Sequence, residues 1–369
     1  MLFLFRALRI LKDALFTPSL SLKTRILMLA LQPITLLTYS IEYYISRRFP
    51  HDTEIQIPLW NGEKVRAVVY IPPAPPSRNP HSSPSREKGE TKKVPIHLNI
   101  HGGAFLGGLP EGNARFCHAL SKSGVLVISS AYRYAPIHTF PDAHEDVVDV
   151  AKWILENAEG VWGADIGTFT VSGFSVGGNL ALGLAQQLRD DSGTKNSRVK
   201  GLISFEGVVD FRLPPSLKPK PKGYPIYDPL SFLMPLFDTY AGPNRIRDIE
   251  DPLLHPTLAD IEALPRNMFF VVGGRDILFA ETAGFVERLV EEARGFNRGL
   301  RGGYPREEDE GEIDIGGKNI VVRSFVAEGQ IHGWTEMPSF AINVELRDRA
   351  FSEAIAFLGN VHAVYSSSK

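Results

Sequence analysis

Short apolar runs alternate with amphipathic segments over most of the chain. Several of the runs are apolar throughout, which is typical of strands buried on both faces of a sheet. The predicted strands are Glu54–Pro58, Lys64–Ile71, Pro95–Ile100, Val125–Ser130, Thr168–Ser172, Val199–Phe205, Met268–Val272 and Asn319–Phe325. Apolar residues at helical spacing predict helices at Glu111–Ser121, Pro141–Asn157, Val176–Arg189, Glu281–Arg294 and Ser339–Gly359. After a first hairpin the strands alternate with helices, which predicts an α/β fold with a mostly parallel, eight-stranded sheet flanked by helices.

The first fifty residues fall outside this alternation. Met1–Phe16 has the pattern of an amphipathic helix, and Ile26–Ile45 is largely apolar but is interrupted by Gln32, Pro33 and Glu42. A spanning helix needs about 20 predominantly apolar residues, so the proline and the carboxylate argue against one. We favour a pair of helices that cap the body of the domain, and a membrane-associated interfacial anchor through residues 1–50 is the alternative.

Composition narrows the classes of partner. The 369 residues are 43% hydrophobic and 22% charged, with a net charge of −2, so no nucleic-acid partner is expected. Cys117 is the single cysteine, which excludes an internal disulfide and a cysteine-based zinc site. The histidines show no metal-binding spacing, so neither a metal nor a cofactor is expected. No secretory signal is recognisable, and we expect a cytoplasmic or membrane-associated location.

Two low-complexity stretches divide the chain further. Pro72–Lys93 is rich in proline, serine and charge, and Gly299–Lys318 is rich in glycine and acidic residues. Both are expected to be surface loops without chemistry, at about residues 72–93 and 299–318. We expect residues 1–52 to form the N-terminal segment and residues 53–369 to form one α/β domain.

A serine at a strand-to-helix turn is the strongest chemical signal. Ser175 lies in the G-x-S-x-G segment Gly173–Gly177, directly after the predicted strand Thr168–Ser172. Such a turn lifts the hydroxyl clear of the sheet, and glycines flank the serine because the tight backbone leaves no room for side chains. The segment therefore predicts a nucleophilic serine.

A serine nucleophile needs a base, and the base needs an orienting partner. His332, beside a glycine in the last strand-to-helix loop, is the candidate base, although a loop histidine can be a plain surface residue. Asp276, which follows a strand and two glycines, is the candidate orienting carboxylate; the alternatives are a helix N-cap for Asp276 and a catalytic role for Glu281. The order serine, aspartate, histidine suits this type of site.

An acyl-transfer site also needs donors for a developing oxyanion. His101, Gly102 and Gly103 come straight off the predicted strand Pro95–Ile100. Glycines let backbone N–H groups approach a bound carbonyl closely, so the predicted donors are the N–H groups of Gly102, Gly103 and Val176.

Together these motifs resemble the hormone-sensitive-lipase-like branch of the α/β-hydrolase superfamily, which includes arylacetamide deacetylases, microbial esterases and plant carboxylesterases. The resemblance implies an α/β-hydrolase fold and a serine esterase with Ser175, Asp276 and His332 as the triad. It also implies a helical cap, built from the N-terminal segment and an insertion at about 213–248. The shared segments are His101–Gly103, Ala131–Pro136, Phe140–Pro141, Glu145–Val147, Gly173–Gly178, Asp251–Leu253, Ala263–Pro265, Gly274–Leu278 and His332–Trp334.

The chain departs from the family pattern at two places: the loop that begins at His101, which we call the oxyanion loop, and the turn around Ser175. Ala104 replaces the third glycine of the loop, which is tolerable because the proposed donors precede it. Phe174 and Val176 stand where many relatives have aspartate and alanine, and the larger Val176 is expected to narrow the acyl site. None of these changes removes a catalytic group.

Other residues of the motifs have two interpretations. Phe105, Phe174 and Trp334 are candidates for lining the substrate pocket, with core packing as the equal alternative. Arg133 and Asp146 are interpreted as a structural pair, because buried charges are usually paired.

The sequence therefore predicts a carboxylesterase that cleaves small-molecule esters of small to medium apolar groups through an acyl-enzyme. Alternatives are an acyltransferase, a lyase or a cyclase using the same site, and a non-catalytic ligand receptor on the hydrolase scaffold. A homodimer remains open. The natural acyl and alcohol groups depend on the cap, which is the most individual part of the chain.

Overall fold

The computed structural model describes residues 8–74, 93–189, 197–224, 232, 234–300 and 318–366. The strands are β1 (Thr53–Pro58), β2 (Lys64–Tyr70), β3 (Val94–Ile100), β4 (Leu126–Ser130), β5 (Ala164–Phe174), β6 (Gly201–Phe205), β7 (Asn267–Gly273) and β8 (Val321–Ala327). The helices are α2 (Arg9–Phe16), α3 (Leu22–Arg48), α4 (Ala114–Lys122), α5 (Asp142–Trp162), α6 (Val176–Gln187), α7 (Met234–Phe237), α8 (Phe279–Leu300) and α9 (Val344–Ser366). Most of the two expected low-complexity loops, at 75–92 and 301–317, lies outside the described residues.

The eight strands form one sheet in the order β1-β2-β4-β3-β5-β6-β7-β8. β1 pairs antiparallel with β2, and β2 pairs antiparallel with β4, whereas every pair from β4 to β8 is parallel. This confirms the predicted mostly parallel sheet. From β3 the chain first adds β4 on one side and then β5 on the other, so the loops after β3 and β5 diverge at a topological switch point. Ligands of open α/β sheets bind at such points.

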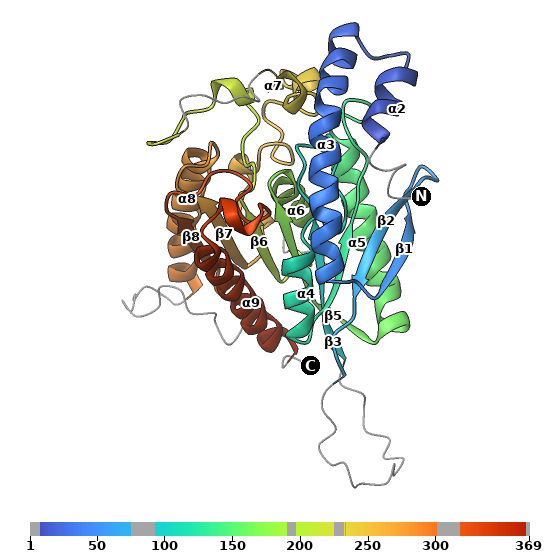
Figure 1. Ribbon diagram of the computed structural model, residues 1–369. Coiled ribbons are helices and arrows are strands. Elements are labelled where there is room, and N and C mark those ends of the chain that lie inside the picture. Colours follow the sequence, from blue (N-terminus) through green and yellow to red (C-terminus); the bar gives the residue numbers. More distant parts are fainter. Residues whose placement is uncertain are drawn as a thin grey trace.

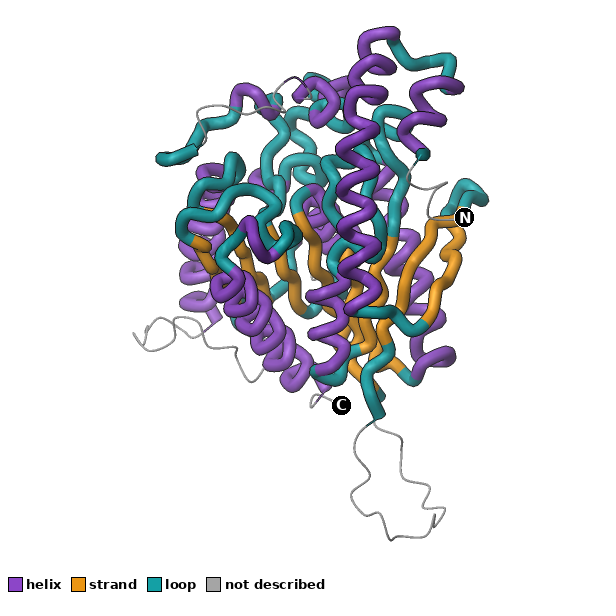
Figure 2. The backbone as a smooth tube through the Cα atoms, in the orientation of Figure 1, coloured by secondary structure: helices purple, strands orange, loops and turns teal. Residues whose placement is uncertain are grey.

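Helices cover both faces of the sheet (Figures 1 and 2). α5, α6 and α8 pack against one face, and α4 and α9 pack against the other. Each face has its own cluster of buried apolar side chains, and Phe116, Phe205 and Phe351 belong to the cluster beneath α4 and α9. The expected helix at Ser339–Gly359 begins later, because Ser339–Ala341 forms a separate 3₁₀ turn before α9.

The N-terminal segment forms two helices, α2 and α3, that pack against each other, and α3 also contacts α4 (Figure 1). The polar residues and the proline within this apolar stretch do not end the helix, since α3 continues for 27 residues through Pro33. Gln32 ties the two helices together, since its Oε1 accepts a hydrogen bond from the backbone N–H of Leu11 at 2.9 Å. By length and composition alone, α3 could also cross a membrane, with a mean hydropathy of 1.3.

The insertion expected at about 213–248 consists of short pieces. Pro215–Leu217 and Gly242–Asn244 are 3₁₀ turns, and α7 lies between them, whereas residues 225–231 and 233 lie outside the described part. α7 contacts α3, and Figure 1 shows both near the same end of the molecule. The two segments expected to form the cap therefore lie together.

Candidate active site

Three side chains from three loops form one hydrogen-bonded row. The Oγ of Ser175, after β5, lies 2.9 Å from Nε2 of His332, which follows β8. The Nδ1 of His332 lies 3.1 Å and 3.0 Å from the two carboxylate oxygens of Asp276, after β7. The loops meet because β5, β7 and β8 are parallel and end at the same edge of the sheet. The structure thus brings together all three residues expected to form the triad.

The backbone around Ser175 explains the flanking glycines. Ser175 itself has φ 52° and ψ −120°, a strained conformation for a residue with a side chain. A Cβ on Gly173 would lie 1.9 Å from the carbonyl oxygen of Gly177, and a Cβ on Gly177 would lie 2.2 Å from the carbonyl oxygen of Ile100. Neither position can accept a larger residue, so the turn requires glycine on both sides of the serine.

The carboxylate of Asp276 contacts both the imidazole of His332 and the backbone. Its side chain is fully buried, and Oδ1 also accepts the N–H of Leu278 at 2.8 Å. The helix-cap alternative and the orienting role are therefore compatible. Glu281 lies elsewhere: it pairs with Lys218 and accepts the N–H of Val209 at 3.1 Å. The structure thus places Asp276, and not Glu281, beside the imidazole.

The carboxylates around His332 favour its protonated form. Burial by itself lowers the pKa of His332, but Asp276 first, and then Glu206 and Glu336, outweigh burial and raise it to about 9. The neutral imidazole that can accept a proton therefore becomes more populated as the pH rises toward that value. The sequence interpretation missed Glu206, although its position directly after the buried strand β6 was a usable signal.

The loop after β3 packs directly against the serine. A Cβ on Gly102 would lie 3.1 Å from the carbonyl oxygen of Phe174 and 3.3 Å from Cβ of Ser175. Gly103 has φ +105°, and a Cβ there would lie 2.1 Å from the carbonyl oxygen of Gly107. Val176, the third expected donor, begins α6. The structure therefore brings Gly102 and Val176 next to the nucleophile, with Gly103 following in the same loop.

His101 supports this loop from inside the protein. Its Nδ1 lies 2.7 Å from the carbonyl oxygen of Gly102, its Nε2 lies 3.1 Å from the hydroxyl of Tyr134, and its ring stacks on Tyr132 at 4.7 Å. Burial lowers the pKa of His101 to about 4, so the ring is neutral at physiological pH. His101 therefore fixes the loop backbone and does not act as a second base.

The N-terminal helices hold the far end of the same loop. The hydroxyl of Tyr39, on α3, accepts the backbone N–H of Gly108 at 2.7 Å. Arg9, on α2, donates to the carbonyl oxygen of Leu106 and lies 4.5 Å from the centre of the Tyr134 ring. The loop that approaches Ser175 is thus bonded to a segment more than sixty residues earlier in the chain.

Replacing Tyr39 by phenylalanine should therefore impair the loop and leave the fold intact. The lost hydrogen bond is worth about 1 kcal/mol, which corresponds to a roughly five- to tenfold lower kcat for a p-nitrophenyl ester. Tyr44→Phe is the matched control, because Tyr44 is 67% exposed on the same helix whereas Tyr39 is 4% exposed. Equal kcat values for the two variants would show that α3 does not position the loop.

The three candidate pocket residues are buried in the protein core. Phe105 and Trp334 are fully buried, and Phe174 is 2% exposed. Phe105 stacks on Tyr240 of the insertion with ring centres 3.7 Å apart, and Phe174 stacks on Phe205 at 4.3 Å. Their burial favours the core-packing alternative. Arg133 and Asp146 form the expected structural pair, with contacts down to 2.7 Å.

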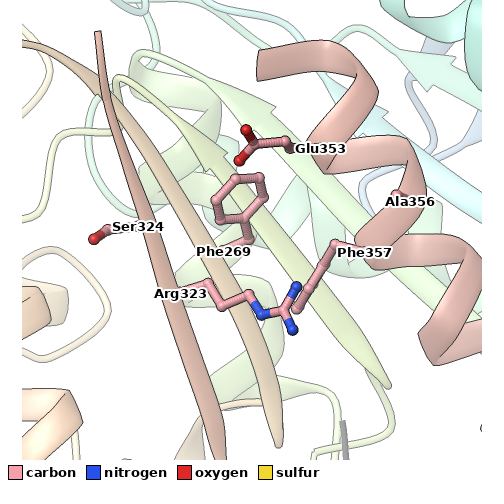
Figure 3. Close-up of a pocket in the computed structure, with 6 residues that line it drawn as sticks. All are labelled: Phe269, Arg323, Ser324, Glu353, Ala356 and Phe357. Atoms are coloured by element: carbon pink, nitrogen blue, oxygen red, sulfur yellow. The ribbon is translucent and has the colours of Figure 1, made fainter. Parts of the chain in front are cut away.

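A surface pocket between β8 and α9 lies away from this site (Figure 3). Arg323 and Ser324, in the middle of β8, line one side of it, whereas His332 follows the C-terminal end of that strand. No residue of the Ser175 row lines the pocket, so we do not assign it to the substrate. Its lining residues are Phe269, Arg323, Ser324, Glu353, Ala356 and Phe357.

Known proteins share the sequence pattern and the fold. Esterase LipI of Mycobacterium tuberculosis is 38% identical over 103 residues, 27% of this chain and 32% of LipI. The chloroplastic tuliposide A-converting enzyme 2 of Tulipa gesneriana is 28% identical over 56% of this chain and 54% of its own length. The chain thus spans about a third to a half of these curated relatives. A crystal form of a Pyrobaculum calidifontis esterase is 25% identical and superposes with a TM-score of 0.65, covering 96% of this chain and 99% of that one.

The match to a family extends over most of the described site. The sequence profile of the alpha/beta hydrolase fold family matches residues 97–296, more than half of the chain. That span includes the loop at Gly102, Ser175 with its flanking glycines, and Asp276; of the three residues in the hydrogen-bonded row, His332 lies beyond it. The chain belongs to the α/β-hydrolase fold family.

Proposed function

We propose that this protein hydrolyses carboxylic esters with small to medium apolar groups through an acyl-enzyme. The observation that supports this most directly is the row of Ser175, His332 and Asp276, with both ring nitrogens of the histidine within 3.1 Å of their partners. The relatives named as esterases support the same reaction.

The first half-reaction acylates the serine. The Oγ of Ser175 attacks the ester carbonyl carbon while its proton passes to Nε2 of His332. The negative charge that develops on the carbonyl oxygen is stabilised by the backbone N–H groups of Gly102, Gly103 and Val176. The carbon–oxygen bond to the alcohol then breaks, and the alcohol leaves with the proton held by His332.

The second half-reaction restores the enzyme. A water molecule gives its proton to Nε2 of His332 as its oxygen attacks the acyl carbon. The bond to Ser175 breaks, the proton returns to Oγ, and the carboxylic acid leaves. Throughout, Asp276 holds Nδ1–H and so keeps Nε2 free to accept a proton.

A panel of p-nitrophenyl esters of increasing acyl length, with covalent labelling by a fluorophosphonate, tests this proposal. We expect turnover of the short and medium esters and a single label, located on Ser175 by peptide mass spectrometry. Absence of both turnover and labelling across the panel would contradict the proposal.

Transfer of the acyl group to an alcohol is the second candidate. The apolar packing of the insertion against Phe105 favours it. Exclusion of water favours transfer over hydrolysis. Adding an alcohol acceptor to the ester assay distinguishes the two, because a transferase forms the new ester at the expense of free acid. A purely ligand-binding role is less favoured, because the serine retains its base.

We further propose that α3 lies on a lipid surface. Leu22, Ile26 and Leu37 are 74%, 57% and 64% exposed, and they recur at helical spacing along its outer side. Exposed Arg47 and Arg48 at its end suit anionic headgroups. Flotation with phosphatidylcholine–phosphatidylserine vesicles tests this: the protein should float, and an Ile26→Ser/Leu37→Ser variant should float less. No flotation of the unaltered protein would exclude lipid binding.

A further inference from the structure

A buried glutamate stands beside the row of three residues. Glu206 follows β6 directly and is 2% exposed, so its carboxyl group lies inside the protein. Its Oε2 is 3.8 Å from Nδ1 of His332, the same ring nitrogen that faces Asp276. The imidazole therefore meets two carboxyl groups at one edge and the serine hydroxyl at the other.

The backbone at Glu206 is unusual as well. Its φ is +52°, in a region that favours glycine and costs a residue with a side chain about 1–3 kcal/mol. Within the described part of the chain, the other non-glycine residues with positive φ are Ala104, Phe105 and Ser175. All of these lie in the loop beside the serine or at the serine itself. Strained positions in this chain thus gather at the site, and Glu206 is one of them.

The hydrogen bonds of Glu206 come from the loop that contains the histidine. Oε2 accepts the backbone N–H of Gly333, and Oε1 accepts the hydroxyl of Thr335 at 3.1 Å and its N–H at 3.5 Å. These donors follow His332 immediately in sequence. The carboxyl group therefore fixes the backbone that sets the position of the imidazole.

The charge of Glu206 is coupled to that of His332. Burial raises the pKa of Glu206 to about 8, and Asp276 adds to the rise, whereas a protonated His332 lowers it. The carboxylate is therefore most stable when the imidazole is charged. That is the state in which His332 holds the proton of Ser175 during acyl transfer.

We propose, building on the proposed ester hydrolysis, that Glu206 is a positioning residue for His332. It anchors the loop at Gly333 and Thr335, and in its ionised form it presents a second negative charge to the imidazolium that forms during the reaction. Two independent features support this role: the hydrogen bonds to the histidine loop, and a strained backbone that brings the carboxyl group to 3.8 Å from Nδ1.

A third carboxyl group belongs to the same environment. Burial raises the pKa of Glu336 to about 7, a hydrogen bond from Asn113 opposes the rise, and Glu336 in turn faces His332. Burial raises the pKa of Glu42, on α3, and the nearby Glu336 and Glu111 add to that rise. A change at Glu206 must therefore be compared with a change at Glu336.

The test is the pH profile of Glu206→Gln. The amide keeps the size of the side chain but cannot become negative, so the imidazolium loses a stabilising charge and the pKa of His332 falls. The neutral base is then available at lower pH, and the acidic limb of kcat/KM should move down by about one pH unit or more. The ring signals of His332 in a histidine-selective NMR titration should move in the same direction.

Two further variants make the test specific. Thr335→Val removes the hydroxyl that donates a hydrogen bond to Glu206 and so destabilises the ionised carboxylate. The acidic limb of kcat/KM should therefore move to lower pH, by less than in Glu206→Gln. Thr335→Val also replaces Glu206→Gln as the test if that variant fails to fold. Glu336→Gln should move the acidic limb less than Glu206→Gln, because Glu206 accepts hydrogen bonds from Gly333 and Thr335 beside His332, whereas Glu336 accepts one from Asn113.

The outcomes separate this inference from the proposed reaction. The positioning role would be overturned if Glu206→Gln lowered activity or stability but left two things unchanged: the acidic limb of the kcat/KM profile and the NMR titration of His332. If the unaltered protein cleaves no ester, the NMR titration still decides the role of Glu206. A shifted titration would then retain this inference while the proposed hydrolysis fails.

Discussion

Replacing Ser175 by alanine is expected to lower kcat for p-nitrophenyl acetate on the order of 10⁶-fold, to the level of residual catalysis by the rest of the site. The hydroxyl is the only group in the row that can form the covalent intermediate. Loss of Oγ leaves His332 and Asp276 in place but gives them no proton to accept. The measurement is the initial rate of p-nitrophenol release, together with loss of the fluorophosphonate label.

The fold should tolerate this change, since Oγ has its side-chain hydrogen bond to His332 alone among the described residues. Thermal unfolding should therefore match that of the unaltered protein. Ser123→Ala is the control, because Ser123 is an exposed serine at the end of α4 and should keep full activity. A Ser175→Ala variant that retained more than a small fraction of the rate would remove the serine from the mechanism.

Asp276→Asn is expected to lower kcat by about 10⁴-fold with little change in fold. The asparagine oxygen can still accept the N–H of Leu278, as Oδ1 of Asp276 does now. Its amide group then faces Nδ1 of His332 and donates to it, which forces the ring proton onto Nε2. A histidine protonated at Nε2 cannot accept the proton of Ser175, so the base is present but in the wrong tautomer.

Asp348→Asn is the matched control, because the side chain of Asp348 is 60% exposed and pairs with Arg347 on its own helix. It should leave kcat unchanged. If Asp276→Asn retained a tenth of the activity or more, Glu206 would be holding the tautomer in place of Asp276. Combining Asp276→Asn with Glu206→Gln would then abolish the remaining rate.

The sequence predicted the sheet and the three central residues because both depend on local patterns. Continuous apolar runs identify buried parallel strands, and the strands bring their C-terminal loops to one edge. Ser175 is marked by its glycines, whose close contacts the structure shows, and Asp276 and His332 follow strands in the required order. These signals lie within a few residues of each functional side chain.

Glu206 and Tyr39 could not be assigned from the same patterns. A glutamate after a strand is ordinary in sequence, and only the folded chain brings it to 3.8 Å from an imidazole that lies 126 positions later. Tyr39 looks like one more apolar residue in a long amphipathic stretch, and its bond to Gly108 depends on how α3 docks. The ambiguity of the N-terminal segment has the same origin, since one face of α3 packs inward while Leu22 and Leu37 remain exposed.

The bond between Tyr39 and Gly108 makes the leading helices part of the structure that supports the loop beside Ser175. A shortened form starting at the first strand would keep nucleophile, base and carboxylate, and would look complete by any comparison of conserved chemistry. It would nevertheless lack the hydroxyl that anchors its oxyanion loop. Attempts to trim this protein for crystallisation, or to graft its catalytic half onto another scaffold, should therefore retain the leading helices as part of the machinery.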